Sequence, residues 1–144
     1  MEKRKIPVFF YGSYINMHVL KEIGLEPGRF EVARLDGYDI EINPIVNLFK
    51  SDKECVYGIV TMATHEELEN LYEHARKVLG GNYLPEAVLV KTNEGMWVSA
   101  LVYIANEIPA KKPTDEYITK IVEAGEEYGI PAWYLDKIET FRPA

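Results

Sequence analysis

A glycine turn flanked by hydroxyl-bearing residues stands near the start of the chain, at Tyr11-Gly12-Ser13-Tyr14. The apolar run before it, residues 6–11, is typical of a buried strand, which places the turn at a strand end. Glycine permits a sharp turn and the close approach of a ligand, and successive amides at such a turn attract a carboxylate or an oxyanion. A plain connector between a strand and a helix can have the same four residues, so both interpretations stay open.

A second candidate is Glu86, a single acid within the otherwise apolar segment 83–90. If its side chain is buried, lost hydration raises the pKa of the carboxyl toward the range that suits a general acid or base. Pro85 can produce a bulge that redirects the neighbouring side chain. Equally, a charge beside a proline on an edge strand protects against aggregation. The sequence favours neither role over the other.

The remaining reactive side chains form no recognised catalytic or metal-binding grouping. His18 and His65 lack a second histidine at ligand spacing, so we expect no metal site. The lone cysteine, Cys55, cannot form an internal disulfide, and its apolar neighbours predict a buried, inert thiol. No Ser-His-Asp or Cys-His arrangement is present, which leaves the glycine turn and the carboxylates as the candidates for chemistry.

Length and charge limit the class of protein that must position these residues. A chain of 144 residues is the usual size of one domain, so we expect a single domain over residues 1–144. The formal charge of −7 repels phosphate backbones, which argues against a nucleic-acid partner. No segment is apolar enough to span a membrane or to resemble a signal peptide, so we expect a cytoplasmic location.

Hydrophobic periodicity predicts mixed secondary structure in the first half of the chain. The predicted elements are a strand at 6–11, a short helix at 15–23, a bent strand or hairpin at 30–42, a loop at 43–53 and a strand at 55–61. Gly24 ends the helix, and Asp36-Gly37 interrupts the long extended segment.

In the second half, Thr64 and Glu67 form a capping box before a helix that extends to Gly80. The next predicted elements are an antiparallel hairpin of strands 83–90 and 97–104, a helix at 114–128 and a short helix after Pro131. Strands and helices do not alternate strictly, and the hairpin is antiparallel. The order therefore favours an α+β fold over a doubly wound sheet.

Several segments, in this order, resemble the gamma-glutamylcyclotransferase-like (AIG2-like) family. They are Phe9-Phe10-Tyr11-Gly12-Ser13, Leu35-Asp36-Gly37-Tyr38, Val56-Tyr57-Gly58-Ile59-Val60 and residues 117–125 and 128–134. The resemblance implies a small mixed β-barrel with flanking helices. It also implies an enzyme that needs no cofactor, binds a small gamma-glutamyl substrate through the Tyr-Gly-Ser turn, and releases 5-oxoproline and a free amine. A monomer or a homodimer is compatible with it.

The chain departs from the family pattern at two places. The family usually has asparagine after Tyr-Gly-Ser, where this chain has Tyr14, and Asn16 is the candidate replacement. When Leu71 is matched to the family's helix leucine, Ala75 falls where the catalytic glutamate belongs. Tyr83 matches a family tyrosine whose hydroxyl is positioned to bond the substrate, although a core role is equally compatible.

Two acids remain as candidates for the missing proton carrier. Glu86 is the preferred one, for the reasons given above. Glu73 is the fallback, although a helix of about 100° per residue places it about 140° from Leu68 and off the inward face. The predicted function is therefore a gamma-glutamylcyclotransferase-like enzyme. The alternatives are a non-catalytic binding or regulatory module on the same fold and a related amide hydrolase.

Overall fold

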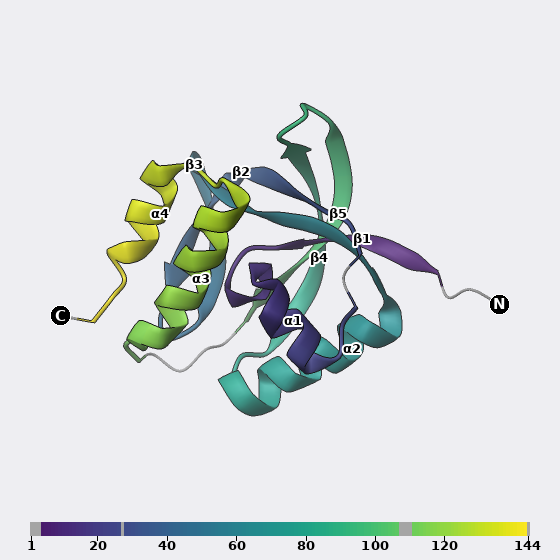
Figure 1. Ribbon diagram of the computed structural model, residues 1–144, viewed down its shortest axis with the longest axis horizontal. Helices are drawn as coiled ribbons and strands as arrows, with labels where there is room; N and C mark the ends of the chain where they lie inside the picture. The colour runs from purple at the N-terminus through teal and green to yellow at the C-terminus, as the bar shows by residue number, and fades with distance from the viewer. Residues whose placement is uncertain (1–3, 27, 107–110, 144) are drawn as a thin grey trace.

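The computed structural model describes residues 4–26, 28–106 and 111–143. Its elements are β1 (Lys5–Phe10), the short helical turn η1 (Ser13–Ile15), α1 (Met17–Ile23), β2 (Phe30–Ile42), β3 (Val46–Thr64), α2 (His65–His74), its π-helical continuation η2 (Ala75–Leu79), β4 (Tyr83–Thr92), β5 (Trp97–Ala105), α3 (Asp115–Tyr128) and α4 (Ala132–Glu139). Helices and strands are intermixed as predicted, so the α+β class is confirmed (Figure 1).

Among the described residues, the strands close into a barrel in the order β1-β3-β2-β4-β5. A parallel contact between β1 and β5 completes the ring, and the other neighbouring strands run antiparallel. Within the described residues, β2 and β4 are joined by two residue pairs, Ala33 with Thr92 and Arg34 with Lys91. The β2–β4 contact is therefore as short as the β1–β5 contact that completes the ring.

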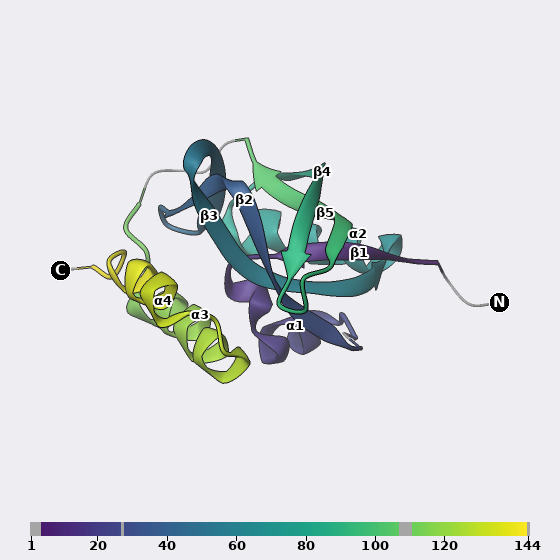
Figure 2. The ribbon, with the colours of Figure 1, turned by 90° about the horizontal axis from the view of Figure 1, so that it is seen from above.

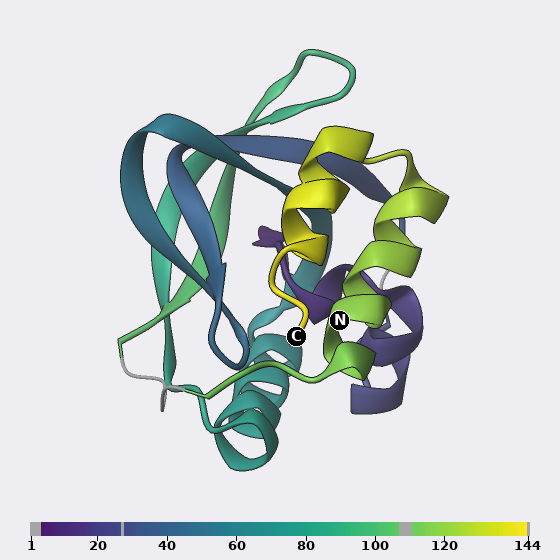
Figure 3. The same ribbon diagram turned by 90° about the vertical axis from the view of Figure 1, so that its left-hand side faces the viewer.

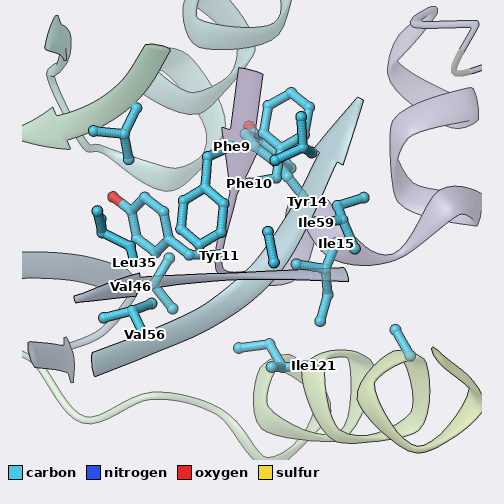
Figure 4. Close-up of a cluster of buried hydrophobic side chains, with 14 of the residues drawn as sticks. Phe9, Phe10, Tyr11, Tyr14, Ile15, Leu35, Val46, Val56, Ile59 and Ile121 are labelled. Atoms are coloured by element: carbon cyan, nitrogen blue, oxygen red, sulfur yellow. The ribbon is translucent and has the colours of Figure 1, made fainter. Parts of the chain in front are cut away.

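The helices cover the barrel on different sides. Helices α3 and α4 lie side by side against one side, while α1 and α2 lie near the end of β1 (Figures 2 and 3). The capping box predicted for α2 is present, since Thr64 Oγ1 accepts from the Glu67 N–H at 3.0 Å and Glu67 Oε1 accepts from the Thr64 N–H at 2.9 Å. Buried aliphatic and aromatic side chains from strands and helices form one core (Figure 4).

The predicted loop at 43–53 is wrong, because β3 begins at Val46 and continues through Thr64. Residues 46–50 pair with β2 residues 38–42, beyond an irregularity between Asp36 and Tyr38. Of the two forms considered for 30–42, the bent strand is therefore correct. The polar residues 50–54 are mostly exposed, and their polarity favoured the prediction of a loop. The strand forms nevertheless, because its residues pair with β2.

A side-chain bridge joins two strands that are not neighbours in the barrel, β3 and β5. The amide of Asn47 donates to the Ala105 carbonyl at 3.1 Å and accepts from the Ala105 N–H at 2.9 Å, linking the start of β3 to the end of β5. The Asn47→Ala substitution removes both bonds and is expected to lower the free energy of unfolding by about 1–3 kcal/mol. Denaturant unfolding measures the loss, and Asn82→Ala, at an exposed asparagine, is the control. Equal stability of the two variants would contradict a role of the bridge in stability.

Candidate functional site

A cavity lies at the end of β1, against the Tyr-Gly-Ser turn. Its lining residues are Phe10, Tyr11, Gly12, Ser13, Tyr14, Val46, Tyr72, Tyr83, Tyr103 and Tyr117. The empty space is about 320 Å³, counting the part open to solvent at its mouth. Five of the six residues predicted to bind substrate line this cavity; Asn16 does not.

The turn is built so that the chain passes close to β3. A Cβ on Gly12 would lie 2.0 Å from Val46 Cγ2, so no larger residue fits while Val46 keeps its position. The Gly12 carbonyl accepts from the Ile15 N–H at 3.0 Å, and the Ser13 carbonyl accepts from the Asn16 N–H at 3.0 Å. These bonds fold the chain directly after β1 and bury Ser13 and Tyr14.

Asn16 does not line the cavity, and its side chain bonds to α1 and α3. Its side-chain oxygen accepts from the His18 N–H at 3.0 Å and caps α1, and its amide donates to the Lys120 carbonyl at 3.2 Å. The bonds tie the turn to α1 and α3. Asn16 therefore positions the turn, and a direct role in substrate binding stays an untested prediction.

Tyrosine rings form most of the cavity wall. Tyr72 stacks on Tyr103, with ring centroids 3.8 Å apart and planes 14° apart, and its edge meets Tyr14 at 5.9 Å. Tyr83 lies 5.7 Å from Tyr72, between ring centroids. Hydroxyls at this wall bond to the backbone: Tyr11 donates to the Tyr103 carbonyl at 2.6 Å, and Tyr83 donates to the Val46 carbonyl.

The wall is electrically neutral. Burial raises the pKa of Tyr11, Tyr14, Tyr72 and Tyr83 well above the usual range for a phenol. The described residues that line the cavity carry no carboxylate and no cationic side chain. The lining offers aromatic faces and turn amides, which suit an uncharged chain or an ammonium at the rings and a carboxylate at the amides.

Because these phenols are buried, we expect the free energy of unfolding to depend on pH in the alkaline range. Their pKa values are higher in the folded state, so the neutral form favours folding. This contribution is complete below the unfolded pKa of about 10 and is lost as pH rises through the folded values. The free energy of unfolding is therefore expected to fall above about pH 10. Tyrosinate absorbance during an alkaline titration tests this, with denatured protein as the control. Ionisation of all ten tyrosines near pH 10 in folded protein would contradict it.

Glu73 lies away from the cavity. Its carboxylate is exposed and pairs with Arg76 at 2.5 Å and with Lys77 at 3.3 Å, and these hydrogen bonds hold its pKa below the usual value. Ala75, at the position matched to the family's glutamate, is fully buried. The π-helical turn that begins at Ala75 does not bring Glu73 to the lining.

Glu86 is exposed on β4, so the burial on which its predicted role was conditional is absent. Its position is nevertheless informative. It pairs directly with Val102 of β5, which in turn pairs with Phe9 of β1, so the three side chains share one face of the sheet. Tyr103, the next residue along β5, stacks on Tyr72 and so lies on the opposite face from Val102, which is fully buried, whereas Glu86 beside it is exposed.

Glu86 makes the smallest of the contributions that raise the pKa of Tyr11. Burial is the main cause of the raised pKa of Tyr11, and neighbouring tyrosines add to it; among the causes, Glu86 is the one carboxylate within the described residues. Tyr11 lines the cavity, while Glu86 does not. Glu86 is therefore an exposed carboxylate outside the lining, on the strand next to the one that contributes Tyr103 to it.

Sequence reasoning did not assign five of the lining residues to the site: Phe10, Val46, Tyr72, Tyr103 and Tyr117. Tyr72 and Tyr117 belong to the apolar stripes of α2 and α3, where they are indistinguishable from core residues. Val46 was placed in the loop that proved to be a strand. The content of ten tyrosines is a signal for an aromatic site. The sequence does not show which of these rings come together.

The described residues contain neither a metal-binding cluster nor a helix that could span a membrane. Residues 4–26, 28–106 and 111–143 contain no group of three or more His, Cys, Asp or Glu placed to hold a metal ion. No described helix has both the length and the hydropathy needed to cross a membrane.

Comparison with known proteins identifies the class to which this barrel and turn belong. The family model described as AIG2-like family matches residues 55–138, more than half of the chain. The chain belongs to the AIG2-like family. The resemblance inferred from the ordered motifs is confirmed.

Curated relatives and solved structures agree with this assignment. The chain is 26% identical to bovine gamma-glutamylcyclotransferase over 126 residues, 79% of this chain and 66% of that protein. It is 24% identical to human gamma-glutamylcyclotransferase, covering 94% and 78% of the two chains. A solved gamma-glutamyl cyclotransferase superposes with a TM-score of 0.81 at 23% identity, over 98% of this chain and 90% of that one. The structure of YkqA from Bacillus subtilis superposes with a TM-score of 0.75 at 20% identity, over 96% of this chain and 54% of that one.

Proposed function

We propose that this protein is a gamma-glutamylcyclotransferase-like enzyme that converts a small gamma-glutamyl amide or amine into 5-oxoproline and a free amine. The observation that carries the proposal is the cavity at the Tyr-Gly-Ser turn, within a family barrel whose curated relatives bear that name. Sequence identity to those relatives is low, so the roles of individual residues are assigned from the contacts in this chain alone.

The cavity supports the binding half of the reaction. Turn amides suit the polar glutamyl end, because an amide N–H donates to carboxylate and carbonyl oxygens. The stacked pair of Tyr72 and Tyr103 offers an apolar surface to the leaving amine. No cofactor or metal is required, since the substrate supplies both the nucleophile and the electrophile.

The chemical half requires one proton carrier. The α-amine attacks the γ-carbonyl carbon, a carbon–nitrogen bond forms to close the ring, and the bond to the leaving nitrogen breaks. One proton moves from the attacking to the leaving nitrogen, so no water is consumed. Glu86 is the candidate carrier, because its partner Val102 also pairs with Phe9 of β1, the strand that ends at the cavity.

Mass spectrometry after incubation of the purified protein with a panel of gamma-glutamyl amides tests the proposal. Release of 5-oxoproline with an equal amount of amine is the expected result. Free glutamate in its place would contradict cyclisation and identify the amide hydrolase. Absence of both products from every substrate would contradict either enzyme.

A binding or regulatory module is the second candidate. Two observations favour it: Ala75 is buried where the family's acid belongs, and the described lining residues include no carboxylate. Titration calorimetry distinguishes it from the enzyme. Saturable binding of a gamma-glutamyl amide that stays intact through the titration supports the module, whereas turnover supports the enzyme.

Other parts of the proposal concern the setting of the protein. We take residues 1–144 as a single domain that works in the cytoplasm as a monomer or a homodimer. The net charge of −7 supports a small molecule over a nucleic acid as the ligand.

A further inference from the structure

Beyond the turn, the lining of the cavity is aromatic and apolar. Apart from Gly12 and Ser13, the described lining residues are Phe10, Tyr11, Tyr14, Val46, Tyr72, Tyr83, Tyr103 and Tyr117. A leaving group held anywhere on this wall therefore contacts aromatic rings or the valine side chain. The amides of the turn are already assigned to the glutamyl end of the substrate.

Tyr72 is the ring at which the wall converges. It stacks on Tyr103, with ring centroids 3.8 Å apart and planes 14° apart. Tyr14 meets it edge-on at 5.9 Å, and Tyr83 lies 5.7 Å from it, both between centroids. The four rings come from η1, α2, β4 and β5, so separate elements hold the cluster in place. An apolar group beside this cluster gains buried area and aromatic contact.

This wall offers no positive charge to a ligand. The described residues that line the cavity include no lysine, arginine or histidine. Burial raises the pKa of all six lining tyrosines, so their phenols are neutral at physiological pH. The hydroxyls of Tyr11, Tyr14 and Tyr83 donate their protons to backbone carbonyls. A carboxylate on the leaving group would lose hydration here without gaining a cationic partner, which costs free energy.

We propose that the group on the leaving nitrogen of the substrate is uncharged and apolar, and that the wall around Tyr72 and Tyr103 rejects leaving groups that carry a carboxylate. The inference rests on the proposed function and narrows its substrate class. Gamma-glutamyl amides of alkyl and arylalkyl amines are good substrates, and gamma-glutamyl amino acids and peptides are poor ones. Ring closure is the same for both classes, because each breaks the bond between the γ-carbonyl carbon and the leaving nitrogen.

Three probes that differ at a single position test the charge preference. Gamma-glutamylphenylalanine has a carboxylate on its leaving group, gamma-glutamylphenylalaninamide has a neutral carboxamide of the same size there, and gamma-glutamylphenethylamine has hydrogen. We expect kcat/KM for the carboxylate probe to lie at least about 10-fold below the value for each neutral probe. Equal values for the carboxylate and carboxamide probes, whether both high or both low, would overturn the inference.

A charged variant tests the wall itself. Tyr103→Arg adds a cation and is expected to raise the ratio of kcat/KM for the carboxylate probe to kcat/KM for the phenethylamine probe by about 10-fold. This ratio does not depend on the amount of folded enzyme. Tyr38→Arg is the matched control, because Tyr38 is also a partly buried strand tyrosine but does not line the cavity. An unchanged ratio in Tyr103→Arg, or an equal rise in Tyr38→Arg, would contradict the role of the wall.

Calorimetry with the same probes separates this inference from the function itself. If the wild type releases 5-oxoproline with the same kcat/KM from the carboxylate and carboxamide probes, the inference is wrong and the function stands. If the wild type binds the probes without turnover, the function is wrong. An affinity at least about 10-fold higher for the neutral probes then still supports the inference, and equal affinities overturn it. If the wild type neither binds nor turns over any probe, both are wrong.

Discussion

Glu86→Gln is expected to lower the rate of 5-oxoproline release by about 100-fold or more, the usual effect of removing a general acid or base. Glutamine keeps the shape of the side chain but cannot accept a proton from the attacking amine. Glu86 is exposed, so the substitution should leave folding unchanged. The measurement is the initial rate of product formation by mass spectrometry, with thermal unfolding of each variant as the check on folding.

The matched control is Glu73→Gln. Glu73 has the same chemistry, but its carboxylate is held in exposed ion pairs with Arg76 and Lys77 outside the cavity, so this variant should retain the wild-type rate. The reverse pattern, with activity lost in Glu73→Gln and kept in Glu86→Gln, would contradict our choice of proton carrier. Equal rates in both variants and the wild type would exclude either acid from that role.

Gly58→Ala is expected to destabilise the fold by about 3 kcal/mol or more, the upper range for overpacking a core. A Cβ on Gly58 would lie 2.0 Å from the carbonyl oxygen of Phe10. The obstacle is backbone, so no side-chain rotation relieves it. Phe10 ends β1 immediately before the turn, so any backbone shift that makes room also moves the cavity. Loss of ligand affinity should accompany the loss of stability.

Denaturant unfolding measures this effect, and Gly28→Ala provides the comparison. Nothing lies within 4 Å of a Cβ built on Gly28, so that variant should keep its stability within about 0.5 kcal/mol. Similar unfolding midpoints for Gly58→Ala and Gly28→Ala would show that β1 and β3 can separate at this point without cost.

Much of the fold was predictable because its signals are local. The capping box of Thr64 and Glu67, the turn after β1 and the β4–β5 hairpin depend on residues a few positions apart. The ordered motifs then predicted the family and the barrel. The main error, the loop at 43–53, arose where local polarity opposed a long-range pairing with β2.

The site was predictable in part for the same reason. Tyr11 to Tyr14 form a continuous turn, and Tyr83 was found through the resemblance; all five line the cavity. Tyr72, Tyr103 and Tyr117 come from separate elements, and periodicity describes which face of a helix is apolar, not which rings meet there.

By itself the sequence determined the α+β class, the turn at the end of β1 and the absence of an acid at position 75. These follow from residue identity and from interactions between near neighbours. Tertiary structure alone decided that Val102 pairs with both Glu86 and Phe9, and that Tyr117 accepts a hydrogen bond from the Val46 N–H. Each of these depends on chain closure over many residues, which no local pattern encodes.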